Sequence, residues 1–136
     1  RLEHITKFNG IEYINDSKAT NIDAVKVAIE SYEKPINLIL GGLAKGNDFS
    51  ELIILKNKIK HIIAYGDARE MISKELSPTF EVSILESLQD AVNHSSQVAK
   101  SGEIVLLSPG CASFDQFKNF EDRGIKFTKW VKELGK

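Results

Sequence analysis

The sequence INLIL at residues 36–40 is the first of four short apolar runs at roughly even spacing; the others are 59–65 (IKHIIAY), 80–85 (FEVSIL) and 103–108 (EIVLLS). Three of the four are nearly continuous apolar segments, which is typical of strands covered on both faces. Helical patterns of apolar residues separate the runs. This alternation predicts a parallel sheet with right-handed crossovers and with helices on both faces.

The chain before the first of these runs predicts a hairpin. The segments 2–8 (LEHITKF) and 11–15 (IEYIN) are both β-prone, and they flank Asn9-Gly10. Asn and Gly both tolerate the positive φ angles of a tight hairpin turn. We therefore expect one α/β domain over residues 1–136, with a mostly parallel sheet of about six strands and an antiparallel strand from the hairpin. The helices are expected within residues 22–32, 49–57, 67–76, 88–99 and 113–134.

Composition excludes several classes of protein. The chain has 136 residues, 42% of them hydrophobic, and a net charge of −1, so it offers no electrostatic argument for nucleic acid or for an anionic membrane. No apolar run approaches the roughly 18–20 residues of a membrane span. The single cysteine, Cys111, permits no internal disulfide, and a cytoplasmic location is expected. The three histidines, His4, His61 and His94, are scattered, so no metal site is expected.

The first loop that we expect at the carboxyl edge of the sheet is residues 15–21, NDSKATN. Ligands of open parallel sheets bind beyond this edge. Thr20 or Asn21 can cap the following helix, which explains part of the polarity of the loop. Capping does not explain Asp16 and Lys18, which suit ribose hydroxyls and an anion respectively. Residues alone leave both interpretations open.

The second loop is residues 41–49, GGLAKGNDF. Gly41 and Gly46 have the spacing of a phosphate-binding P-loop, but Asn47 stands where the P-loop lysine must follow. The loop is therefore not expected to cradle a triphosphate. Lys45 could present an ammonium group to an anion, although composition alone favours a solvated turn lysine.

The third loop is residues 108–120, SPGCASFDQFKNF. Ser113 and Gln116 have the spacing of a capping box, which predicts that the last helix opens at Ser113. Small residues precede Ser113, so an anion could approach the helix N-terminus there. Ser113 could thus cap the helix, bind an anion or do both. Cys111 is expected to be a small buried side chain rather than a nucleophile.

The phenylalanines of the third loop have different expected environments. Phe117 fits the apolar stripe of the last helix best, and Phe120 also fits it, which favours the core for both. Phe114 lies outside the stripe and could face a pocket.

Four strings of residues together resemble the Mur ligases, and within that family the members that add D-glutamate. They are Arg1-Leu2-Glu3, NDSKATN at 15–21, GGxxK at 41–45, and the segment 108–124 that contains CASFDQFKNF. The folylpolyglutamate synthases share the fold but resemble the last string less. The resemblance implies a Rossmann-like, three-layer C-terminal domain. The UDP-binding domain and the central ATPase domain of the family, which carries the P-loop and the magnesium sites, are absent from this chain.

The resemblance implies two groups of binding residues and no catalytic or metal-ligating residue in the chain. For ATP it implies Arg1 at the phosphates, Asp16 at the ribose and Lys18 nearby. For the carboxylates of D-glutamate it implies Thr20, Lys45, Ser113 and the backbone of Phe114, with Phe120 lining the pocket.

The activity that the resemblance implies is ATP-dependent amide-bond formation in the synthesis of peptidoglycan precursors. ATP, with Mg²⁺, phosphorylates a carboxylate of UDP-N-acetylmuramoyl-L-alanine, and the amine of D-glutamate then attacks the acyl phosphate. The chain begins at Arg1 without Met, so we interpret it as a fragment that is inactive alone. The alternatives are the C-terminal domain of another Mur or folylpolyglutamate-type ligase, and a non-catalytic, flavodoxin-like binding module.

Overall fold

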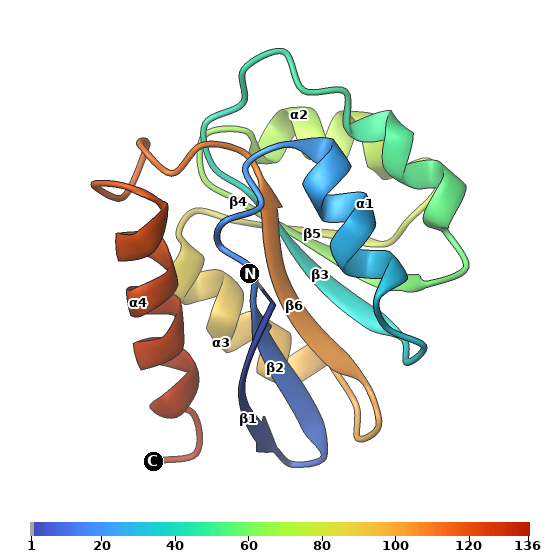
Figure 1. Cartoon of the computed structure of the whole chain (residues 1–136). Helices are drawn as coiled ribbons and strands as arrows, with labels where there is room; N and C mark the ends of the chain where they lie inside the picture. The colour runs from blue at the N-terminus through green and yellow to red at the C-terminus, as the bar shows by residue number, and fades with distance from the viewer. Residues whose placement is uncertain (1) are drawn as a thin grey trace.

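A six-stranded sheet forms the middle layer of the computed structural model, which describes residues 2–136 (Figure 1). The strand order is β1-β2-β6-β3-β4-β5, so the last strand of the sequence lies between β2 and β3. All neighbouring strands are parallel except β1 and β2. This confirms the expected fold class. The strands are β1 (Glu3–Phe8), β2 (Ile11–Asn15), β3 (Ile36–Gly41), β4 (Ile59–Tyr65), β5 (Val82–Leu85) and β6 (Ile104–Gly110).

The predicted N-terminal hairpin is confirmed. β1 and β2 pair antiparallel, with Phe8 opposite Ile11. Asn9 has φ 54° and Gly10 has φ 76°, the positive angles that a two-residue hairpin turn requires. The turn therefore fixes the register of the strand from which the first loop emerges.

Helices cover both faces of the sheet (Figure 1). One apolar core packs α1, η1 and α2 against one face, and a second packs α3 and α4 against the other. β3 and β6 are buried along their whole length, as expected for central strands of a three-layer fold. The helices are α1 (Ile22–Glu30), the 3₁₀ helix η1 (Phe49–Leu55), α2 (Arg69–Leu76), α3 (Leu88–Val98) and α4 (Phe120–Lys132).

The predicted start of the last helix at Ser113 is wrong. α4 begins at Phe120, and the side chain of Asn119 caps it by accepting a hydrogen bond from the Asp122 amide at 2.8 Å. The carbonyl oxygen of Ser113 instead accepts from the amides of Gln116 and Phe117, so this segment is a turn. Two acidic residues, Glu121 and Asp122, favour a helix that begins after Asn119, because they lie in its first turn and interact favourably with the helix dipole.

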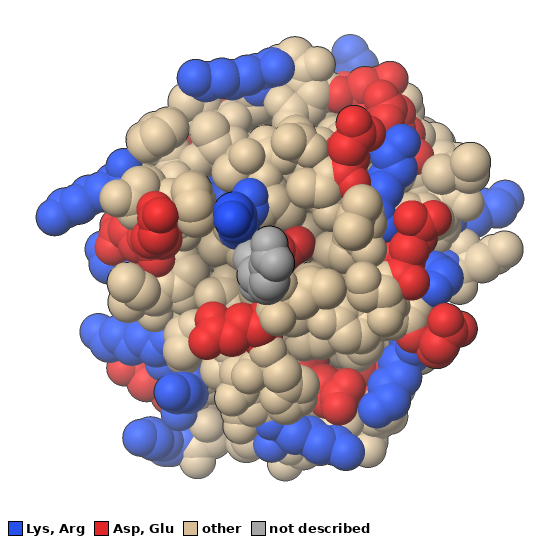
Figure 2. All heavy atoms as spheres, viewed as in Figure 1, with Lys and Arg blue, Asp and Glu red and all other residues tan. Residues whose placement is uncertain are grey.

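Charges of both signs are interspersed on the face shown in Figure 2. Neither sign forms a continuous field there, in keeping with the net charge of −1. Within residues 2–136, every helix is too short or too polar to cross a bilayer.

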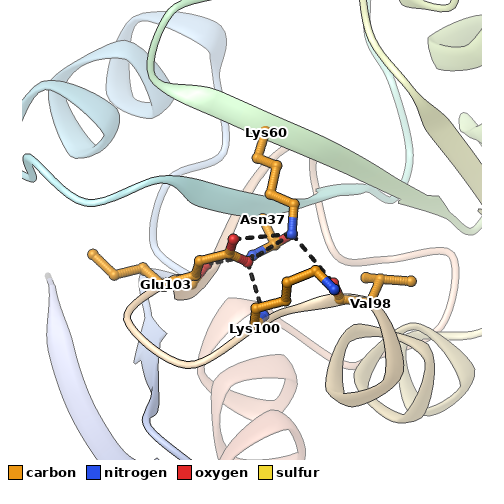
Figure 3. Close-up of polar contacts among 6 residues, drawn as sticks. Asn37, Lys60, Val98, Lys100 and Glu103 are labelled. Atoms are coloured by element: carbon orange, nitrogen blue, oxygen red, sulfur yellow. Dashed lines mark hydrogen bonds and ion pairs between the residues drawn. The ribbon is translucent and has the colours of Figure 1, made fainter.

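A charged network joins three strands at the amino edge of the sheet (Figure 3). Lys60 Nζ lies 2.9 Å from both carboxylate oxygens of Glu103. The Asn37 side chain and the Lys100 amide donate to the same carboxylate at 3.1 and 2.9 Å. Burial opposes ionisation of Glu103, but these hydrogen bonds outweigh it and hold the pKa of the carboxyl below its usual value. The network therefore ties β3 and β4 to the start of β6.

Glu103→Gln is expected to lower the free energy of unfolding at pH 7 by about 1–2 kcal/mol, because it removes charge-assisted hydrogen bonds from a side chain that is only 12% exposed. The folded-state pKa is depressed, so this stabilisation is complete above the unfolded-state pKa of about 4.3 and is lost as the pH falls through the folded-state pKa. Urea unfolding from pH 7 to pH 3 measures it. Glu33→Gln is the control, since that carboxylate is 96% exposed and 4.0 Å from Lys58. Equal stability losses in the two variants would contradict the prediction.

Candidate functional site

The three loops meet at the carboxyl edge of the sheet, because β6 lies between β2 and β3. The Gly110 amide of the third loop donates to the Ala19 carbonyl of the first loop at 2.8 Å. Leu43 of the second loop and Ala112 of the third exchange two backbone hydrogen bonds, of 2.9 and 3.1 Å. The third loop is thus bonded to both others, and the three form one rim.

Asn47, which occupies the position of the P-loop lysine, anchors the second loop. Its side-chain oxygen accepts a hydrogen bond from the Lys45 amide at 2.7 Å, and its side-chain nitrogen donates to the Gly110 carbonyl. This amide fixes the backbone that carries Lys45 against the third loop. This role of Asn47 could not be predicted from the sequence.

Thr20 and Lys45 line one hollow, of about 440 Å³, which we call the Thr20–Lys45 hollow. Ala112 also lines it, whereas the next residue, Ser113, is buried at 2% exposure and is not among the lining residues. Thr20 and Lys45 are both exposed, so a hydroxyl and an ammonium are available in the same hollow. Such donors suit a carboxylate.

Three acidic side chains, Asp23, Asp48 and Glu51, also line the Thr20–Lys45 hollow, and each has a partner. Asp48 caps η1 by accepting from the Ser50 amide at 3.1 Å. Lys26 Nζ lies 2.8 Å from Glu51 and 3.9 Å from Asp23. The negative charge of the hollow is therefore partly balanced by a neighbouring cation.

Asp16 and Lys18 line a second hollow, of about 680 Å³, which we call the Asp16–Lys18 hollow. Ser108 Oγ of β6 donates to Asp16 Oδ2 at 3.1 Å and so orients this carboxylate, which is 7% exposed. The remaining lining is apolar. Arg1, predicted at the ATP phosphates, lies outside the described residues. The apolar lining residues are Leu2, Ala19, Ala24, Val27 and Ala28.

Phe120 and Phe114 do not join Thr20 and Lys45. Phe120, the first residue of α4, lines a third hollow, of about 690 Å³, together with Lys18. Phe114 is 62% exposed and lies outside the linings of all three hollows. In this arrangement of the domain, the phenylalanines assigned to the D-glutamate pocket are separate from the polar residues assigned to it.

Cys111 is fully buried, as expected. Burial raises the pKa of its thiol to about 12, and the nearby Arg123 guanidinium only partly offsets this. The thiol is therefore protonated at neutral pH, which argues against a nucleophilic role.

Arg123 is the main feature of the site that the sequence analysis missed. Its side chain is fully buried and donates to Ser17 and to Cys111. A signal was present: Arg123 stands four residues before Phe127, on the buried side of α4. An arginine at such a position indicates a buried guanidinium with specific acceptors.

Comparison with known proteins gives close relatives over nearly the whole chain. It is 44% identical over 135 residues to the UDP-N-acetylmuramoylalanine–D-glutamate ligase of Chlamydia pneumoniae and 47% identical over 135 residues to that of Protochlamydia amoebophila. Each match covers 98% of this chain. The chain spans only 32% and 30% of the lengths of these relatives.

Solved structures share the fold at low sequence identity. A murein peptide ligase, Mpl, from Psychrobacter arcticus has a TM-score of 0.65 at 15% identity, covering 97% of this chain and 30% of that protein. The MurF ligase of Thermotoga maritima, solved in complex with ADP, has a TM-score of 0.55 at 12% identity, covering 94% of this chain and 30% of that one. The family described as "Mur ligase, glutamate ligase domain" matches residues 1–111. This chain therefore belongs to the Mur ligase family, as its glutamate ligase domain.

Proposed function

We propose that this chain is the part of an ATP-dependent ligase that binds D-glutamate and completes the nucleotide site. The whole enzyme joins D-glutamate to UDP-N-acetylmuramoyl-L-alanine in the synthesis of peptidoglycan precursors. The names of the relatives at 44% and 47% identity support D-glutamate rather than another amino acid.

The observation that carries the proposal is the hollow that Thr20 and Lys45 share, which is also lined by Ala112, the residue before Ser113. D-glutamate brings two carboxylates to this rim. Each charge-assisted hydrogen bond to a carboxylate contributes about 1.5–3 kcal/mol. These contacts strengthen when another domain closes over the hollow and excludes water. In the proposal Phe114 and Phe120 reach D-glutamate only in that closed state.

The Asp16–Lys18 hollow fits a nucleotide. Its apolar wall suits a base, the carboxylate of Asp16 suits ribose hydroxyls, and the ammonium of Lys18 suits a phosphate. Among residues 2–136, no group of three or more His, Cys, Asp or Glu side chains is placed to hold a metal ion. In the proposal, the domains outside this chain hold Mg²⁺ and UDP-N-acetylmuramoyl-L-alanine.

In the proposed reaction this chain positions reactants and supplies no reacting group. Lys45, Thr20 and Ser113 hold the carboxylates of D-glutamate, which leaves its amine free to face the acyl phosphate. The effect is one of proximity and orientation, because the amine and the activated carboxylate are presented to each other as one complex.

Lys45→Ala in the complete enzyme is expected to raise the KM for D-glutamate at least about tenfold, because one charged contact is lost. The KM for ATP is expected to stay within about twofold, since Lys45 lies outside the Asp16–Lys18 hollow. Steady-state kinetics with each substrate varied in turn measures both. Lys74→Ala, an exposed lysine in the last turn of α2, is the matched control. An unchanged KM for D-glutamate would remove Lys45 from the site.

A further inference from the structure

Arg123 lies beneath the rim and bonds to two of its loops. Its Nε donates to Ser17 Oγ at 2.9 Å, and one terminal nitrogen, Nη2, donates to the Ser17 carbonyl at 2.6 Å. The other, Nη1, donates to the Cys111 carbonyl at 3.0 Å. Ser17 belongs to the first loop and Cys111 to the third, so one side chain joins two loops that lie 94 positions apart in the sequence (111 − 17).

The second loop packs against the same guanidinium. A Cβ atom added to Gly42 would lie 3.4 Å from Arg123 Nη1, 3.2 Å from Cys111 Cβ and 2.5 Å from the Ala112 carbonyl oxygen. Only a glycine allows the backbone to approach this closely. The three loops therefore meet around one side chain.

Stability alone does not explain why an arginine occupies position 123. A fully buried guanidinium carries a desolvation cost that an apolar side chain of similar size would avoid. Arginine offers in return a rigid planar fork whose donors fix the spacing and direction of several acceptors at once. Here the acceptors are two backbone carbonyls and one hydroxyl, so the fork fixes backbone positions.

The fixed backbone positions are close in sequence to the proposed ligand contacts of both substrates. Ser17 lies between Asp16 and Lys18, and its own hydroxyl donates to the Phe120 carbonyl at 2.7 Å. Cys111 precedes Ser113 by two residues. We propose that Arg123 is a positioning residue for the ligase reaction, whose buried guanidinium sets the three loops against one another so that the ATP and D-glutamate subsites form as one unit.

This inference rests on the proposed function and predicts a kinetic pattern that a ligand-contacting residue does not give. Arg123→Lys keeps the charge, but a single ammonium cannot hold Ser17 and Cys111 together. In the complete enzyme the KM for ATP and the KM for D-glutamate are expected to rise together, each at least about tenfold. The KM for UDP-N-acetylmuramoyl-L-alanine is expected to stay within about twofold, because that substrate binds through other domains. A merely structural role would instead lower the folded fraction and leave all three KM values unchanged.

The matched control is Arg69→Lys. Arg69 also donates from its guanidinium to a backbone carbonyl, that of Gly66, at 2.8 Å, but it joins none of the three loops. All three KM values are expected to stay near wild type. If Arg123→Lys does not fold, Ser17→Ala removes only the hydroxyl and is expected to raise both KM values about three- to fivefold. Unchanged KM values for ATP and D-glutamate in a folded variant would overturn the proposal.

Amide hydrogen exchange tests the positioning role independently of activity. In Arg123→Lys, or in Ser17→Ala if the former does not fold, exchange of the Gly110 and Ala112 amides is expected to accelerate at least about tenfold, because these amides bond the third loop to the first and second. Unchanged exchange at both would overturn the inference. A wild-type enzyme that forms no ADP when both UDP-N-acetylmuramoyl-L-alanine and D-glutamate are present would contradict the proposed function, while the exchange measurement would still decide the role of Arg123.

Discussion

Gly42→Ala is expected to lower the free energy of unfolding by about 2–4 kcal/mol and to disrupt the rim. Gly42 has φ 124°, which side chains rarely adopt, and its added Cβ would lie 2.5 Å from the Ala112 carbonyl oxygen. That oxygen accepts the hydrogen bond from the Leu43 amide. The backbone must move, and the movement separates the second loop from the third. Urea unfolding measures the stability.

Gly102→Ala is a control that separates the two causes of the expected loss of stability in Gly42→Ala, which are backbone strain and steric clash. Gly102 has φ 91°, but its added Cβ would meet nothing within 4 Å. The substitution therefore imposes backbone strain without a clash, and about 1 kcal/mol is expected. In the complete enzyme Gly42→Ala should also raise the KM for D-glutamate, whereas Gly102→Ala should not. Equal losses of stability in the two variants would show that the close approach to Ala112 contributes nothing.

The 136-residue chain alone is expected to form no ADP from ATP, at any concentration of D-glutamate. Its second loop has the spacing of a P-loop but carries Asn47 in place of the lysine, and the Asn47 side chain is engaged in holding that loop in place. In the proposed function, the other domains of the enzyme hold the phosphates of ATP for the reaction. A coupled assay for ADP, run beside the complete enzyme with UDP-N-acetylmuramoyl-L-alanine and D-glutamate both present, measures the difference.

Asp16→Ala in the isolated chain guards against a contaminating ATPase. Residual turnover that is the same in wild type and in Asp16→Ala comes from a contaminant. Turnover in the wild-type chain that Asp16→Ala abolishes would contradict the division of labour between this chain and the other domains.

The layers of the fold could be predicted because their causes are local. Continuous apolar runs such as 36–40 and 59–65 have few alternatives to a buried strand, and Asn9-Gly10 has few alternatives to a tight turn. The start of the last helix could not be predicted in the same way. Ser113 and Asn119 are both plausible caps, because acidic residues follow each of them. Asp115 follows Ser113, and Glu121 and Asp122 follow Asn119, a difference too small to choose between the two caps from the sequence.

For the site, the sequence predicted that the three loops share one edge of the sheet, but it did not predict which residues line the same hollow. Loops that follow parallel strands must share one edge, so the meeting of the first, second and third loops follows from their positions after strands. Which residues share a hollow depends on the insertion of β6 between β2 and β3, a non-local fact. Arg123 was missed because a charge is expected to face solvent, whereas three distant acceptors hold it inside.

The central position of β6 in the sheet affects how the protein can fold during its synthesis on the ribosome. β2 and β3 have no direct pairing, since the strand that bonds both is Ile104–Gly110. Until Ile104–Gly110 has left the ribosome, a nascent chain cannot join β2 and β3 into one sheet. The three loops of the rim can therefore come together only after β6 has joined the sheet, which is a late step in synthesis.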